Sequence, residues 1–150
     1  MTAERVGLFA AALVVTGGLA GGFALIGSPP HQRELELDRR RVADLAEAAG
    51  ALQRRFHPGD DGTQISLPAA LPRDLVVQYV NRAVETTDPR DHRAYVYVRE
   101  SPTRYRLCAT FALPSASGDG GYGDGWPHGA GPQCYRFDVT RGAEPQSPSE

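Results

Sequence analysis

The stretch that decides the fold is "RYRLCATFA", residues 104–112, which contains one of the two cysteines of the chain. Its side chains alternate strictly between apolar and polar, the pattern of a β-strand with one buried face. The apolar face consists of Tyr105, Leu107, Ala109 and Phe111, and the polar face of Arg104, Arg106, Cys108 and Thr110. We therefore predict a strand here, with Cys108 pointing away from the core.

Two further stretches show a strand pattern. "QCYRFDV", residues 133–139, alternates in the same way and places Cys134 on its polar face. "AYVYVRE", residues 94–100, combines aromatic and β-branched residues, and Ser101-Pro102-Thr103 would join it to residues 104–112 as a hairpin. The expected unit is a small three-stranded antiparallel sheet.

The polar faces of two of these strands suggest a disulfide. If residues 104–112 and 133–139 are antiparallel neighbours, the sulfurs of Cys108 and Cys134 point to the same side of the sheet. A bond between them would close a loop of roughly 27 residues and stabilise the fold by about 3.5 kcal/mol. The alternative is a pair of unbonded, partly buried thiols.

Residues 31–56 carry the apolar stripe of an amphipathic helix. Apolar residues recur every seven positions and at the intervening steps of three and four, namely Leu35, Val42, Leu45, Ala49, Leu52 and Phe56. Asp38 interrupts the stripe near its beginning. We expect this helix to lie against the sheet; a coiled coil is the alternative.

The N-terminal segment predicts a membrane anchor over residues 1–30. Val6–Gly27 contains 22 residues without a charge, and a helix of this length spans about 30 Å, the thickness of a bilayer's hydrocarbon core. A cleaved signal peptide is the alternative. Gly27-Ser28-Pro29-Pro30 would end the helix, and Ser28 would cap the next one.

The orientation of the anchor follows from two opposing observations. Arginines after the segment favour a cytoplasmic C-terminus, whereas a disulfide requires an oxidising compartment. We give the cysteines more weight and predict a single-pass protein of the inner (cytoplasmic) membrane with an extracytoplasmic domain. The expected domains are the anchor (1–30), an α+β domain (31–140) and a disordered polar tail (141–150), with a short helix over Arg73–Val84.

The chain shows no motif for catalysis. A nucleophile elbow, a phosphate loop, a zinc signature and paired carboxylates are all missing, so we expect no enzyme and no cofactor. With 16 basic and 18 acidic side chains, we expect no nucleic-acid partner. His128 is interpreted as a turn residue and the outer arginines Arg104 and Arg106 as solvated side chains, with anion binding as the alternative for the arginines.

The long connection between the last two strands is expected to need an anchor. Its only tryptophan is Trp126, and we predict that this side chain folds back over the outer face of the sheet, beside the disulfide.

The order of these motifs resembles the pilin fold, and among pilins the major pseudopilins of type II secretion systems. The resemblance covers residues 33–111 and rests on "DRRRVADLAEAAGALQRRF", "SLPAALPRDL" and "DPRDHRAYVYV". It implies a long N-terminal helix packed on an antiparallel sheet, and a calcium site in a C-terminal acidic loop. Asp119 and Asp124 of the glycine-rich loop are the candidate carboxylates for that site, and a solvated loop without metal is the favoured interpretation. Gly22-Phe23 lies deep inside the apolar run and not after a short basic leader, so we expect no prepilin-type processing; Gly27 stands where pilins carry a glutamate, so we expect no filament assembly through that residue. "YRLCATF" with the later tryptophan and cysteine is also similar to small uncharacterised bacterial membrane proteins.

Two functions agree with these features. The first is a membrane-anchored, non-catalytic pilin-like scaffold or interaction module of the bacterial cell envelope, possibly in secretion, with the lipid bilayer and a membrane protein as partners. The second is an extracytoplasmic sensing domain that binds a small anion or calcium near the glycine-rich loop.

Overall fold

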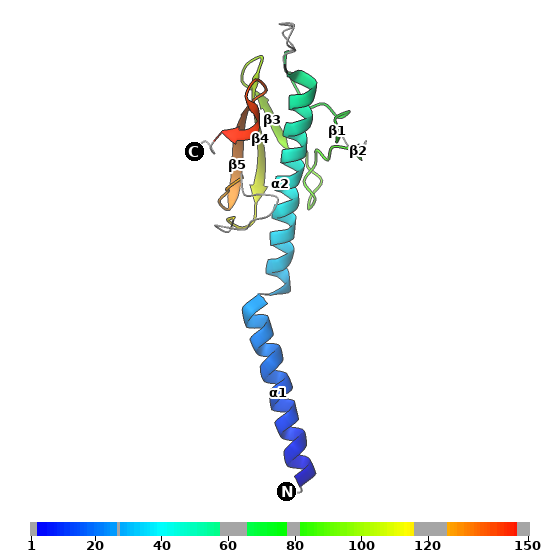
Figure 1. Cartoon of the computed structure of the whole chain (residues 1–150), viewed down its shortest axis with the longest axis vertical. Helices are drawn as coiled ribbons and strands as arrows, with labels where there is room; N and C mark the ends of the chain where they lie inside the picture. Colours follow the sequence, from blue (N-terminus) through cyan, green and yellow to red (C-terminus); the bar gives the residue numbers. More distant parts are fainter. Residues whose placement is uncertain (1–2, 27, 58–65, 78–81, 116–125, 147–150) are drawn as a thin grey trace. The chain divides into compact units, whose positions relative to one another are not determined.

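The computed structural model describes residues 3–26, 28–57, 66–77, 82–115 and 126–146 and has an α+β fold (Figure 1). The chain divides into two compact units, Met1–Glu34 and Leu35–Glu150. The first contains helix α1 (Ala3–Ile26). The second contains most of helix α2 (Pro29–Phe56) and all of the β-strands.

Helix α1 presents large apolar side chains to its surroundings. The most exposed of these are Leu8, Phe9, Leu13, Val14, Val15 and Leu19. Among the residues that the structure describes, no helix is both long and apolar enough to cross a membrane. The predicted anchor also includes Gly27 and the side chains of residues 6, 10, 20 and 23–26, which lie outside the described part of the chain.

Helix α2 begins where the sequence predicts. The helix starts at Pro29, and the Ser28 carbonyl accepts a hydrogen bond from the backbone N–H of Gln32 at 3.1 Å. Proline is compatible with the first turn of a helix because the N–H it lacks would have no partner inside the helix. The apolar stripe of α2 is buried, which confirms an amphipathic helix packed on a sheet.

The main sheet is antiparallel and has four strands in the order β3-β4-β5-β6. Their bounds are Val96–Arg99, Arg104–Phe111, Gly131–Asp138 and Gly142–Gln146. The first three correspond to the predicted strands. The fourth corrects the prediction of a disordered tail at residues 142–146, whereas residues 147–150 lie outside the described part of the chain.

Strand β6 forms because a tight turn returns the chain along β5. The Asp138 carboxylate accepts hydrogen bonds from the N–H and hydroxyl of Thr140, and the Arg141 N–H donates to the Asp138 carbonyl at 2.9 Å. Gly142 then adopts a φ of 120°, which favours glycine. Pro145 is tolerated in β6 because this strand is at an edge of the sheet.

The predicted helix over Arg73–Val84 is wrong. Residues Val76–Val77 (β1) and Arg82–Ala83 (β2) form a small antiparallel pair instead; Val80 lies outside the described residues. Branched side chains favour extended backbone over helix. Leu75 and Val84 flank this pair and are both buried. The Val84 N–H donates a hydrogen bond to the Leu75 carbonyl at 2.9 Å, which continues the pairing of the two segments.

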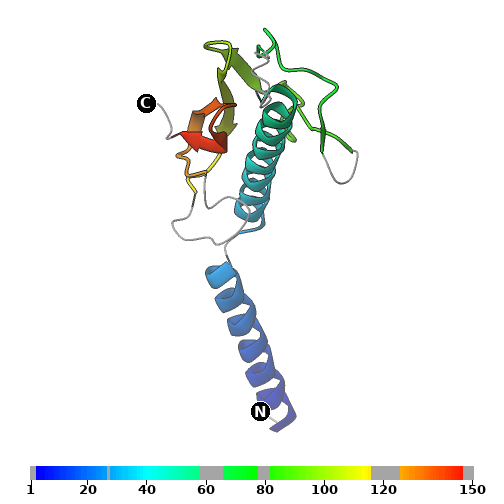
Figure 2. The same ribbon diagram turned by 45° about the horizontal axis from the view of Figure 1, so that its top comes forward.

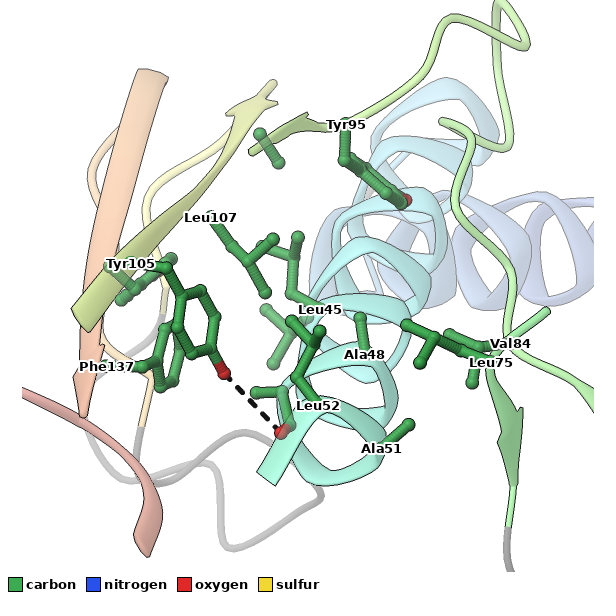
Figure 3. Packing of buried hydrophobic residues seen from close by; sticks show 14 of the residues in the cluster. Leu45, Ala48, Ala51, Leu52, Leu75, Val84, Tyr95, Tyr105, Leu107 and Phe137 are labelled. Atoms are coloured by element: carbon green, nitrogen blue, oxygen red, sulfur yellow. Dashed lines mark hydrogen bonds between the residues drawn. The ribbon is translucent and has the colours of Figure 1, made fainter. Parts of the chain in front are cut away.

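Helix α2 lies between the main sheet and the segment that carries β1 and β2, as two views agree (Figures 1 and 2). On the sheet side, Leu45 and Leu52 are fully buried. Figure 3 shows the Tyr105 ring beside Phe137, at a centroid distance of 5.1 Å, with its hydroxyl 3.5 Å from the Ala49 carbonyl oxygen.

The opposite side of α2 is lined by small residues. Ala48 and Ala51 are buried there, and Figure 3 places them toward Leu75 and Val84. Small side chains allow the backbone of the β1–β2 segment to come close to the helix. Buried apolar residues therefore contact α2 on both sides. Polar side chains on the buried parts of α2 need hydrogen-bond partners within the protein, because they are shielded from water.

Candidate functional site

The disulfide prediction is confirmed: Cys108 of β4 is bonded to Cys134 of β5. The two residues are directly opposite in the antiparallel register, with Cα atoms 4.1 Å apart. This short spacing is typical of a non-hydrogen-bonded pair, in which the side chains start close together. The bond lies on the face of the sheet opposite to the α2 core and ties the two central strands to one register.

The outer face of the sheet also carries two arginines in direct opposition. Arg106 of β4 pairs with Arg136 of β5, two residues from the disulfide on each strand. A single carboxylate oxygen, Glu100 Oε1, lies 2.8 Å from Arg106 Nε and 3.4 Å from Arg136 Nε. Arg104, the other predicted outer arginine, is exposed and directly opposite Asp138 in the same register.

The prediction that Trp126 covers the outer face is wrong. Its side chain is only 8% exposed and belongs to the core on the other face. The indole lies 4.8 Å from the Tyr135 ring and 5.3 Å from the Phe137 ring, and both rings point away from the disulfide. An indole that fills the end of the core removes more apolar surface from water than one laid over arginine stems.

His128 takes part in the packing of the same loop. Its ring stacks on Phe111 with centroids 3.9 Å apart. Its backbone N–H donates to the Ser115 hydroxyl, and the Ser115 N–H donates to the His128 carbonyl at 2.9 Å. These contacts close the base of the loop whose central residues, 116–125, lie outside the described part of the chain.

A buried charge network is the main feature that the sequence analysis missed. Asp38 and Arg41 of α2 are 3% and 4% exposed. Arg41 Nη1 donates to Asp38 Oδ1 at 2.6 Å, while Nε and Nη2 donate to the two carboxylate oxygens of Asp88 at 2.6 and 3.0 Å. The guanidinium therefore joins two carboxylates, one of them from a turn 47 residues away.

Asp38 also connects α2 with the end of strand β4. Its carboxylate accepts backbone N–H groups from Ala112, at 3.0 and 3.1 Å, and from Leu113, at 2.9 Å. Together with the hydrogen bond from Arg41, these contacts tie the carboxylate to two separate parts of the chain. The only signal in the sequence was the position of Asp38 within an apolar stripe.

The network also sets the protonation of its members. The hydrogen bond with Asp88 raises the pKa of the Arg41 guanidinium, and this outweighs the opposing effect of burial. Burial is the largest single effect on the pKa of Asp88 and acts to raise it, but the hydrogen bonds and charge of Arg41, together with backbone N–H groups of the turn, outweigh burial and lower this pKa. Both groups are charged at neutral pH, and their ion pair joins helix α2 to the turn that contains Asp88.

A second carboxylate of α2 behaves differently. The Tyr95 hydroxyl donates to Asp44 Oδ2 at 2.8 Å. Burial raises the pKa of Asp44 to about 6, and the nearby Glu47 and Glu85 act in the same direction, while the bond from Tyr95 and the charge of Arg82 oppose them. Asp44 therefore titrates just below neutral pH.

The described residues give no direct indication of a metal site. They contain no group of three or more His, Cys, Asp or Glu side chains placed to hold an ion. Asp119 and Asp124, the calcium ligands considered above, lie outside the described residues.

The comparisons with known proteins add no relative. No family model, no curated protein and no solved structure matches the chain. What can be said of its function therefore rests on the residues and contacts described above.

Proposed function

We propose that this chain is a membrane-anchored, non-catalytic interaction module of the bacterial cell envelope, with a disulfide-bonded, pilin-like domain on the extracytoplasmic side. The observation that carries the proposal is the distribution of exposed apolar side chains around α1. The packing of α2 across an antiparallel sheet supports the pilin-like part.

The apolar side chains of α1 surround the helix. Leu8, Phe9, Leu13, Val14, Val15 and Leu19 are each 60–75% exposed. At about 100° per residue, no angular gap between them exceeds roughly 100°. A protein partner covers one face of a helix, whereas lipid covers all of it, and a helix that is apolar all round is typical of a buried or membrane environment. A lipid bilayer is therefore the best-supported surrounding.

The side of the membrane follows from the disulfide. Cys108 and Cys134 are bonded, and disulfides persist in oxidising compartments. The arginines that follow α1 favour the opposite orientation. We give the disulfide priority because the bond itself must form in the compartment where the domain folds.

Membrane insertion is tested with the purified full chain and protein-free liposomes. We expect the chain to float with the liposomes and to resist alkaline extraction. Leu13→Arg with Val14→Arg should release it, because charges at the centre of an apolar helix are costly in lipid. Val96→Arg is the matched control, because Val96 is an exposed valine of the domain, at 56%. Flotation of all three proteins alike, or of none, would contradict the proposal.

The orientation needs a separate test in cells. Alkaline phosphatase fused after Phe56 should be active and a cytoplasmic reporter at the same position inactive. The reverse pattern would place the domain in the cytoplasm and leave the anchor itself unaffected.

A further inference from the structure

We propose that Arg106 and Arg136 form a binding site for a small oxyanion, the phosphate or carboxylate group of a ligand, in which the Glu100 carboxylate competes for the same position. The proposal concerns the outer face of the sheet and does not depend on the membrane anchor. It rests on the strand register, on the position of Glu100 and on an unsatisfied donor.

The register brings two like charges together. Arg106 and Arg136 are directly opposite, and because antiparallel pairs alternate in type, they form the same closely spaced kind of pair as the cysteines two residues away. Like charges in this position destabilise a sheet. A sequence that breaks a local rule at a solvent-accessible position, without a gain in packing, is typical of a binding site.

The Glu100 carboxylate shows where the two arginines can hold an oxygen atom between them. Its Oε1 lies 2.8 Å from Arg106 Nε and 3.4 Å from Arg136 Nε. The two guanidinium groups are therefore spaced to share one oxyanion, and guanidinium groups suit carboxylate and phosphate oxygens. Among the side chains that the structure describes, one carboxylate contacts both arginines and balances one of their two positive charges, so a further negative charge is favoured here.

The contact with Glu100 leaves a donor unsatisfied. Within the described part of the chain, Arg106 Nε is enclosed from solvent and makes no hydrogen bond, although Glu100 Oε1 is near. An acceptor that is near a buried N–H but poorly aligned with it compensates only in part for the loss of water. An oxyanion that aligns with this N–H and with Arg136 would satisfy it, and Glu100 would move into solvent.

The site is held in place by the strands that form it. The Cys108–Cys134 bond joins β4 and β5 next to the arginine pair, and the residues between them, Leu107 and Tyr135, are fully buried on the other face. The backbone positions of the two arginines are thus fixed before a ligand arrives, which reduces the entropic cost of binding.

The experiment is a titration of the full chain, in detergent, with inorganic phosphate, at constant ionic strength maintained with chloride. The signals of the arginine Nε–H groups are followed by NMR. We expect saturable shifts of Arg106 and Arg136. Parallel titration with acetate distinguishes a preference for phosphate from one for carboxylate.

Three variants decide the proposal. Glu100→Gln should tighten phosphate binding about tenfold, because it removes the internal competitor. Arg136→Gln should weaken it by about tenfold or more, and Arg136→Lys, which keeps the charge and the fold, should also weaken it because the planar donor set is lost. The matched control is Arg99→Gln, an exposed strand arginine that is paired with Tyr105 and therefore lies on the opposite face of the sheet from the arginine pair. Equal effects of Arg99→Gln and Arg136→Gln, or no tightening in Glu100→Gln, would overturn it.

Discussion

Replacing Arg41 by methionine should destabilise the domain far more than the same change at its neighbour. Arg41 donates three hydrogen bonds to Asp38 and Asp88, and its side chain is 5% exposed. Arg40 is 64% exposed and forms an ion pair with Glu36, one turn earlier on the surface of the helix. Both substitutions remove one positive charge from adjacent positions of α2. The difference between their effects on the free energy of unfolding therefore reports on the burial of Arg41 and on its ion-pair partners.

The magnitude follows from what remains after the change. Arg41→Met leaves two carboxylates without a cation, and removal of one partner from a buried ion pair costs about 3–5 kcal/mol. Arg40→Met should cost about 0.5 kcal/mol, as for an exposed pair within a helix. With a urea m-value of about 1.5 kcal/mol/M, these values correspond to a midpoint about 2–3 M lower for the first variant and almost unchanged for the second.

The assay is urea unfolding of the full chain in mild detergent, followed by Trp126 fluorescence. Trp126 is the only tryptophan in the chain and is buried in the core, so its emission reports on this domain. Asp38→Asn serves as a second variant that should still fold, because Arg41 and Asp88 remain paired, and Arg41→Met should cost less in that background. Equal midpoints for the Arg40 and Arg41 variants would refute the reasoning.

Three further changes have expected outcomes. Trp126→Ala should lower the free energy of unfolding by about 3–5 kcal/mol, the usual cost of emptying an aromatic core position, as measured by circular dichroism. Cys108→Ser combined with Cys134→Ser should cost about 3.5 kcal/mol from loop entropy, and unchanged melting temperatures would show that the bond adds no stability. Gly142→Ala should cost about 1 kcal/mol, because alanine is strained at a positive φ; an unaffected variant would indicate that the β5–β6 turn adapts.

The sequence predicted those parts of the structure in which a local repeat carries the information. Strict alternation places Cys108 and Cys134 on the outer faces of their strands. In the observed register the two residues are directly opposite, so that their side chains are close enough to form a disulfide. The apolar stripe of α2 likewise identifies its buried face. In both cases, the spacing of the apolar residues matches the repeat of the backbone, two residues in a strand and about 3.6 in a helix.

The missed features depend on contacts between distant segments. Asp38 within an apolar stripe is compatible with an exposed interruption or a buried ion pair. The donors that decide between them are Arg41 and the backbone N–H groups of residues 112–113, and Arg41 is itself held by the distant Asp88. Trp126 stands in a loop, where no period indicates which face a side chain will reach. Strand β6 is short and contains a proline, and its order derives from pairing with β5.

Asp44 gives the domain a pH dependence whose direction can be worked out. Burial raises its pKa in the folded state from 3.8 to about 6. A carboxyl group with a raised pKa stabilises the fold fully below its unfolded pKa, and this contribution is lost as the pH rises through the folded pKa. The domain should therefore lose stability between about pH 4 and pH 6 through this group, by about 2 kcal/mol after allowance for partial exposure of the side chain.

Asp44→Asn tests this directly, because asparagine keeps an oxygen that accepts the hydrogen bond from Tyr95 and cannot ionise. Relative to the unmodified chain, the variant should gain stability at pH 7.5 and show little difference at pH 4.5, when urea midpoints are compared. Asp88, whose pKa is lowered, acts in the opposite direction and loses its contribution at lower pH, so the difference between the two proteins is the quantity to follow. The control is Glu36→Gln on an exposed position of α2, which should change the midpoints at both pH values alike. A difference for Asp44→Asn that is the same at pH 4.5 and pH 7.5 would show that Asp44 stays ionised in the fold without cost.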